Sequence, residues 1–273
     1  MTNVKLNNSI EMPILGLGVY KITDKKELEN AVKWAIDAGY RKFDTAQFYD
    51  NEKELGEAIK KTGIKREEVF ITTKIWNTKQ GYNSTRKSFE ESLEKLNTDY
   101  IDLILIHWPG QKKERYLETY RALENICQSK KAKSIGLSNF EIHNLKDIFA
   151  HCNIAPVLNQ IERHPNLLRN ELVEFCQNHN IILEAWSPLG RGKLLNDKTI
   201  IDIAKKYNKT PAQIILRWNI ESNISVIPKS INKERIEENI NIFDFTLDKN
   251  DIEKINSLEN GYRVGPDPMT FDF

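Results

Sequence analysis

The chain has 273 residues, and its 40 basic and 39 acidic side chains give a formal net charge of +1. A hydrophobic share of 40% and a charged share of 29% are ordinary for a soluble globular protein and argue against disorder. The balanced charge provides no electrostatic field that would attract nucleic acid. No apolar run reaches the ~20 residues that span a membrane, and no leader pattern opens the chain. We therefore expect a cytoplasmic protein without nucleic-acid or membrane partners.

The chain begins with a predicted hairpin and an amphipathic helix. Val4 to Met12, with Asn7-Asn8-Ser9 in its middle, is typical of a hairpin, and we expect it to close the bottom of a barrel. Asp24 can cap the helix, with Glu27 reaching back three residues later. The apolar residues that follow share one helical face: Leu28, Ala31, Val32, Ala35 and Ile36.

Short apolar and β-branched runs then alternate with helical patterns. The eight predicted strands cover residues 15–17, 41–44, 69–73, 101–106, 134–137, 157–161, 181–185 and 224–227. The helical patterns among them cover residues 51–61, 85–96, 117–129, 142–150 and 168–178. An extra helix is capped by Thr210, with Pro211 at its first position and Gln213 completing a capping box.

This order of elements predicts one domain over residues 1–273, an α/β fold of the (β/α)8 TIM barrel type with an N-terminal β-hairpin and extra C-terminal helices. No linker or shift of composition divides the chain. The tail from Gly261 carries Pro266 and Pro268, so we expect an irregular segment folded over the barrel mouth. The three cysteines have no metal-binding or disulfide spacing, and we expect no metal.

The active site of such a barrel lies at the C-terminal ends of the strands, so the residues that end each strand are the candidates. These are Gly18 to Tyr20, Asp44, Lys74, His107, Ser138 with Asn139, Gln160, Trp186, and Lys229 with Ser230. An acid, a lysine and a histidine end three successive strands, and Tyr49 follows the acid by five residues.

Those four side chains could together donate a proton. A tyrosine with a pKa of ~10 is a weak acid at neutral pH, and a Lys74 ammonium would lower the pKa of Tyr49. Asp44 would keep the buried lysine cationic, and His107 could orient a carbonyl oxygen beside the Tyr49 hydroxyl. No serine or cysteine stands beside a base, and the carboxylates are too few for glycoside hydrolysis, so a hydride donor is the missing partner.

The run Asp44-Thr-Ala-Gln-Phe-Tyr49-Asp-Asn-Glu52 strongly resembles the signature of the aldo-keto reductase family. Similar motifs follow in the family's order from Gly16 to about Pro268: Thr-Lys-Ile-Trp-Asn at 73–77, His-Trp-Pro at 107–109, Gly136 to Phe140, and Ile227 to Asn239. The compact loops and Ala185-Trp-Ser-Pro-Leu-Gly-Arg-Gly192 look most like bacterial enzymes of the 2,5-diketogluconate reductase and prostaglandin F synthase type. The resemblance implies NADPH-dependent reduction of aldehydes and ketones to alcohols. It also implies a catalytic tetrad of Tyr49, Asp44, Lys74 and His107, with Tyr49 as the general acid.

The resemblance implies that NADPH lies extended across the barrel mouth, and no third glycine completes a Rossmann fingerprint after Gly18. Trp186 would stack on the nicotinamide. The other implied cofactor-binding residues are Ser138, Asn139 and Gln160 at the nicotinamide amide, Glu238 and Asn239 at the adenine, and Gly18, Val19, Tyr20, Asp44, Ser187 and Leu189. A 2′-phosphate needs localised charge and donors, which Lys229, Ser230 and Arg235 would supply.

By the same resemblance, an apolar cavity above the nicotinamide binds a small carbonyl substrate. Its residues would be Tyr20, Trp76, Trp108 and Phe140, with Tyr49 and His107 at the reacting end. Substrate identity in this architecture is carried by the loops, so the sequence does not specify the carbonyl compound. Family members are commonly monomeric, and we expect a monomer.

Two other functions compete with this interpretation. Lys74 could form a Schiff base, as in barrel aldolases, which borohydride would trap. A nucleotide-sensing module, similar to the cytoplasmic β subunits of potassium channels, would bind the cofactor but turn over very slowly. Because a fold does not by itself specify a function, the complete tetrad is the argument against the sensing module.

Overall fold

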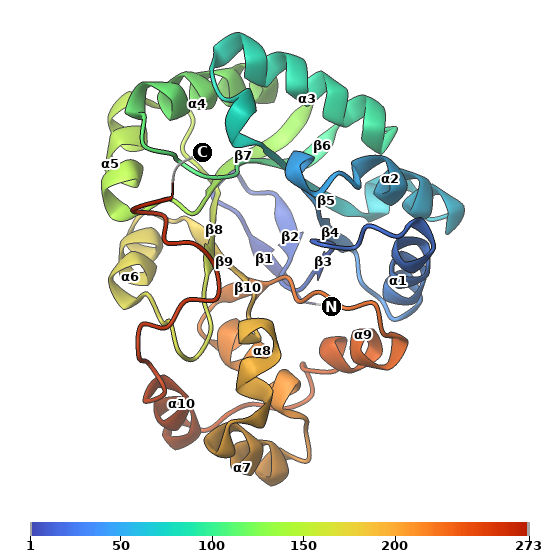
Figure 1. The fold of residues 1–273 in the computed structure, drawn as a ribbon, viewed down its shortest axis with the longest axis vertical. Helices are drawn as coiled ribbons and strands as arrows, with labels where there is room; N and C mark the ends of the chain where they lie inside the picture. The colour runs from blue at the N-terminus through green and yellow to red at the C-terminus, as the bar shows by residue number, and fades with distance from the viewer. Residues whose placement is uncertain (1, 272–273) are drawn as a thin grey trace.

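Eight parallel strands pair in chain order around a barrel in the computed structural model, which describes residues 2–271 (Figure 1). They are β3 (Leu17–Gly18), β4 (Lys42–Asp44), β5 (Phe70–Ile75), β6 (Ile101–Ile106), β7 (Ala132–Ser138), β8 (Leu158–Glu162), β9 (Ile182–Trp186) and β10 (Ile224–Val226). The barrel closes where Gly16 N donates to Val226 O at 2.9 Å and Val226 N donates to Ile14 O at 2.9 Å. The predicted (β/α)8 barrel is confirmed.

Helices surround the barrel (Figure 1). They are α1 (Lys25–Asp37), α2 (Glu52–Lys61), α3 (Tyr82–Leu96), α4 (Lys113–Gln128), α5 (Ile142–His151), α6 (Asn170–Asn178), α7 (Lys198–Tyr207), α8 (Pro211–Glu221), α9 (Lys233–Ile240) and α10 (Lys249–Asn256). Asp24 caps α1 through the Glu27 amide at 2.8 Å, and Thr210 with Gln213 forms the predicted reciprocal capping box of α8. Among residues 2–271, no helix combines the length and apolarity needed to cross a membrane.

The predicted hairpin is present as β1 (Asn3–Lys5) paired with β2 (Glu11–Pro13). Leu6 and Met12 of the hairpin join a buried cluster with Phe70 of β5, Leu103 of β6 and Val157, which directly precedes β8. The hairpin therefore covers the end of the barrel at which the strands begin, as expected.

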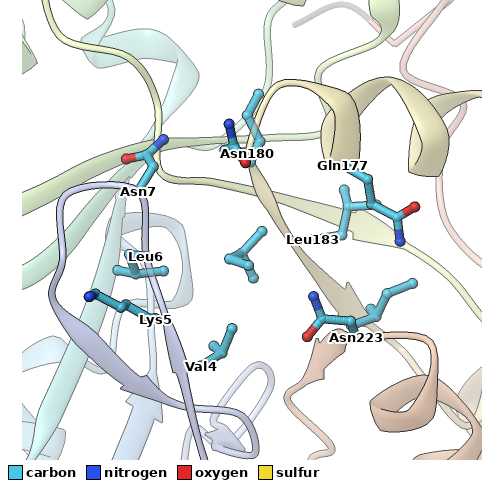
Figure 2. A pocket seen from close by; sticks show the side chains of 11 residues that line it. Val4, Lys5, Leu6, Asn7, Gln177, Asn180, Leu183 and Asn223 are labelled. Atoms are coloured by element: carbon cyan, nitrogen blue, oxygen red, sulfur yellow. The ribbon is translucent and has the colours of Figure 1, made fainter.

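A hollow of about 510 Å³ lies beside this hairpin, lined in part by Lys5, Asn7, Asn180 and Asn223 (Figure 2). It sits at the starts of β9 and β10, opposite the strand ends that carry the candidate chemistry. Lys5 is the only titratable side chain among its described lining residues. Acid–base chemistry therefore has to be sought at the other end.

The tail from Gly261 to Phe271 has no helix or strand, and it reaches the barrel mouth as predicted. The Gln111 side-chain amide donates to Met269 O at 3.3 Å, and the Phe271 ring centroid lies 4.6 Å from that of Trp108. Residues 272 and 273, which the prediction included, lie outside the described residues.

Candidate active site

Tyr49 stands in a tight loop after β4, in the single turn η1 (Gln47–Tyr49). Asn51 clamps this loop to its neighbours, because its Nδ2 donates to Val19 O at 2.9 Å and its Oδ1 accepts from Thr45 Oγ1 at 2.7 Å. Gln47 Oε1 accepts from Trp76 N at 2.9 Å and ties the loop to the end of β5. These bonds fix the backbone that carries the phenol, and no role was predicted for either amide.

The structure brings the predicted acid, lysine and tyrosine into contact. Lys74 Nζ lies 2.6 Å from Asp44 Oδ1, 2.8 Å from Thr45 O and 3.3 Å from Tyr49 Oη. Lys74 is fully buried, and its three ammonium hydrogens have three acceptors. A Schiff base would require this nitrogen to be neutral and free to attack, so the geometry argues against the aldolase alternative.

The charges of the buried pair support each other. Burial lowers the pKa of Lys74, but Asp44 and then Tyr49 together outweigh burial and raise that pKa above its ordinary value. Burial raises the pKa of the Asp44 carboxyl, and the Lys74 charge offsets part of the rise. The lysine is therefore held as a cation beside the phenol, as predicted.

The Tyr49 hydroxyl itself differs from the prediction. Burial raises the pKa of Tyr49 to about 12, and Lys74 lowers it only in part. The expectation of a lowered pKa was wrong for the protein alone, because desolvation of the phenolate outweighs one neighbouring cation. Tyr49 consequently remains protonated across the physiological range, which is the state a proton donor requires.

His107 lies across from Tyr49, with ring centroids 5.7 Å apart and planes at 75°. Burial, and then the Lys74 charge, lowers the pKa of His107 well below its ordinary value, so the ring is neutral. Its Nδ1 has no hydrogen-bond partner among residues 2–271, and its backbone carbonyl accepts from Asn139 Nδ2 at 2.9 Å. A neutral ring can donate one hydrogen bond toward the mouth without adding charge.

The residues expected at the nicotinamide gather on neighbouring strands at this mouth. Ser138 pairs with Gln160 in the β7–β8 register. Gln160 Nε2 donates to Asp44 Oδ2 at 2.8 Å, and Asn139 Oδ1 accepts from Trp186 Nε1 at 2.8 Å. The half-buried Trp186 indole is thereby held at the mouth, with Ser187 and Leu189 following it along the chain.

Two cations lie near the start of α9. Lys229 and Arg235 are exposed, and neither forms an ion pair with another of residues 2–271. Ser230 Oγ accepts from Asn232 N at 3.0 Å, and Asn232 caps the helix. Unpaired cations beside a helix N-terminus fit a phosphate group.

Other predicted cofactor residues have local partners. A Cβ atom at Gly18 would stand 2.9 Å from Ile227 O, so the glycine permits close backbone approach there. Val19 is fully buried. Glu238 Oε1 accepts from Thr210 Oγ1 at 2.6 Å, and Asn239 is buried on α9.

Aromatic side chains form the wall of the mouth. Tyr20 lies 4.8 Å from Tyr49 between ring centroids, and Trp76 lies 5.1 Å from His107. Phe48, which was not predicted, stacks on Trp76 at 4.0 Å and is 50% exposed. Its position next to Tyr49 in the signature run was the available signal.

Phe140 is the exception among the predicted wall residues. Its side chain is fully buried in the main core, edge-on to Tyr116 of α4 at 5.4 Å. Asn139 before it has a positive φ of 64°, and the chain turns there. The structure therefore does not support Phe140 as a substrate contact, whereas Trp108 keeps its place at the mouth through Phe271.

Comparisons with known proteins agree along the whole chain. The family model described as "Aldo/keto reductase family" matches residues 14–260. The chain is 49% identical over 271 residues to the 9,11-endoperoxide prostaglandin H2 reductase of Trypanosoma cruzi (strain CL Brener), covering 98% of this chain and 95% of that protein. It is 49% identical over 265 residues to the glyoxal reductase of Bacillus subtilis (strain 168), covering 97% and 95%. The solved structure of a Gox0644 mutant in complex with NADPH matches with a TM-score of 0.95 at 41% identity, covering 100% of this chain and 99% of that one.

Proposed function

The chain belongs to the aldo/keto reductase family and reduces aldehydes and ketones to alcohols with NADPH, and on that premise we propose that Tyr49 protonates the substrate oxygen. The observation that carries the proposal is the buried chain of contacts from Asp44 through Lys74 to Tyr49, at 2.6 Å and 3.3 Å. A protonated phenol beside a fixed cation can release its proton to an alkoxide as that charge develops.

Each side chain has one role in the mechanism. The nicotinamide, when bound, supplies the hydride that the carbonyl carbon receives. Tyr49 gives its proton to the carbonyl oxygen, and Lys74 stabilises the phenolate that remains. Neutral His107 donates a hydrogen bond that orients the same oxygen. Asp44 keeps Lys74 charged when solvent is excluded.

We propose that NADPH is held from the barrel centre to α9. Trp186 would stack on the nicotinamide, and Gln160 with Asn139 would bind its amide. Lys229 and Arg235 would bind the 2′-phosphate, because both are exposed cations without an ion-pair partner among residues 2–271. The remaining residues assigned to the cofactor by resemblance are Gly18, Val19, Tyr20, Ser138, Ser187, Leu189, Ser230, Glu238 and Asn239.

The substrate wall is aromatic. Phe48, Trp76 and Trp108 present aromatic faces and edges around the reacting end, and the centroid of the Tyr20 ring lies 4.8 Å from that of Tyr49. Apolar walls with few polar groups suit aldehydes and ketones with apolar bodies. The glyoxal reductase relative makes dicarbonyl compounds the first members of a test panel.

The test is a titration of the purified protein with NADPH and with NADH, following the quench of tryptophan fluorescence. A panel of glyoxal, methylglyoxal, benzaldehyde and simple ketones is then added, and nicotinamide absorbance is followed. Tight NADPH binding with turnover is the expected result. Binding without turnover would favour the sensing module, and no binding would contradict the nucleotide site.

We also propose that residues 1–273 act as one domain and as a monomer. The strands whose ends carry the residues assigned to the reaction all belong to one eight-stranded sheet. Light scattering on the eluting peak of a gel-filtration column checks the assembly, with a mass near 31.8 kDa as the expected value.

A further inference from the structure

A second buried ion pair lies inside the barrel, one layer nearer its bottom than the catalytic residues. Lys42 and Asp44 are two residues apart on β4, so both side chains face the interior. Lys42 Nζ contacts Glu184 Oε2 of β9 and donates to Ser225 Oγ of β10 at 2.6 Å. Gly16 makes room for this lysine, because a Cβ atom there would stand 2.6 Å from Lys42 Cε.

Gln160 joins this lower pair to the catalytic layer. Its Nε2 lies 2.8 Å from Asp44 Oδ2 and 2.9 Å from Glu184 Oε1. An amide nitrogen has two hydrogens, so both are used. Oε1 of Gln160 accepts no hydrogen bond from residues 2–271, and it is the one atom of the amide left for a ligand.

We propose that Glu184 is a positioning residue: it fixes the Gln160 amide with its nitrogen on Asp44 and its oxygen available to the cofactor amide, while Lys42 pairs with the other oxygen of Glu184. The inference rests on the proposed function, which assigns Asp44 to the catalytic layer and Gln160 to the nicotinamide. One carboxylate would hold the amide by a single bond, whereas two carboxylates occupy both hydrogens and exclude the reversed orientation.

The chemistry of the pair supports this role over a purely structural one. Burial alone would raise the pKa of Glu184, but Lys42 and the hydrogen bonds to the carboxylate lower it below its ordinary value. An ionised carboxylate has no hydrogen to donate, so Glu184 offers Gln160 an acceptor through either of its oxygens. A buried ion pair adds little stability compared with apolar side chains of the same volume, so stability does not account for it.

Two double variants isolate the acceptor from the charge. Lys42→Met with Glu184→Gln keeps an amide oxygen that can accept from Gln160, and Lys42→Met with Glu184→Leu removes it. Neither leaves an unpaired charge. We expect the Leu double variant to bind NADPH about tenfold more weakly and to have about tenfold lower kcat than the Gln double variant. Equal NADPH Kd and kcat in both, with only Tm changed, would overturn the proposal. Glu184→Met with Lys42→Met replaces the Leu variant, with the same expectation, if that variant does not fold.

A mutant cycle tests the route through Gln160. In a Gln160→Leu background, adding Lys42→Met with Glu184→Leu should change the NADPH Kd less than twofold, because the amide it acts through is gone. Additive losses in Kd would overturn the proposal. Tyr49→Phe is measured in parallel: if that variant keeps its activity, the proposed proton donor fails, while the Kd cycle still decides the role of Glu184.

Discussion

Replacing Asp44 by Asn tests the electrostatic support of the catalytic lysine. Asp44 accepts from Lys74 at 2.6 Å and from Gln160 at 2.8 Å, and an asparagine can accept from one and must turn its amide hydrogens toward the other. Removing one partner of a buried pair costs about 3–5 kcal/mol, which lowers the Tm of a chain of this size by roughly 5–9 °C. We also expect kcat to fall about 100-fold, because Lys74 loses its charge beside Tyr49.

The pH dependence of this loss has a definite sign. Without Asp44, burial lowers the folded-state pKa of Lys74 below its unfolded value, so the unfolded chain binds more protons and stability rises with pH up to about 10.4. In the unchanged protein the pKa of Lys74 is raised, so its contribution is fully present at neutral pH and is lost as pH rises through that raised value. The Tm gap between the two proteins should therefore narrow from pH 7 to pH 10.

The assay is thermal unfolding followed by circular dichroism between pH 6 and pH 10. Asp37→Asn is the matched control, since Asp37 pairs with Lys33 at 2.6 Å on the surface with side chains 59% and 63% exposed. The control should shift Tm by less than about 1 °C, because an exposed pair contributes little. A Tm loss as small as the control's, or a gap independent of pH, would refute the reasoning.

Three further predictions concern the cofactor and the histidine. Replacing Lys229 and Arg235 by Ala should raise the NADPH Kd at least about tenfold and leave the NADH Kd nearly unchanged; equal weakening of both in a fluorescence titration would contradict a 2′-phosphate site. Gly265→Ala should weaken NADPH binding, because a Cβ atom there would stand 2.3 Å from the edge of the Trp186 ring and would displace that ring. An unchanged NADPH Kd would show that the tail moves away and leaves Trp186 in place. His107 has a lowered pKa and stays neutral, so kcat for reduction should not change between pH 5.5 and pH 8. A fall in kcat below about pH 6.5 that the His107→Gln substitution abolishes would instead show that the histidine becomes charged.

The sequence was sufficient for the barrel and for the convergence of the catalytic side chains. Parallel strands in chain order bring their carboxyl ends to one mouth, so Asp44 and Lys74 could be placed together from strand position alone. Helices α7 and α10 were missed, and their buried Ile200 and Ile255 pack in a smaller cluster outside the barrel, away from the alternation of strands and helices that the prediction followed. Their Asp197 and Asp248 caps were the available signals.

Contacts across the barrel could not be read from the sequence. Lys42 shares a face with Asp44 by the two-residue period, yet its partner Glu184 lies 142 residues away. Strand periodicity shows which way a side chain points, but not which side chain of a distant strand meets it. The sign of the Tyr49 pKa shift depends on how far burial outweighs a single cation, which is a property of the packed site.

Tyr49→Phe gives the most direct test of the central claim. The substitution removes the hydroxyl that lies 3.3 Å from Lys74 Nζ and leaves the ring that packs on Tyr20. Steady-state reduction of a panel aldehyde and NADPH binding are measured on the same preparation. We predict that kcat falls at least about 100-fold while the NADPH Kd changes less than twofold. Retained turnover, or an equal loss of turnover and of NADPH binding, would contradict Tyr49 as the proton donor.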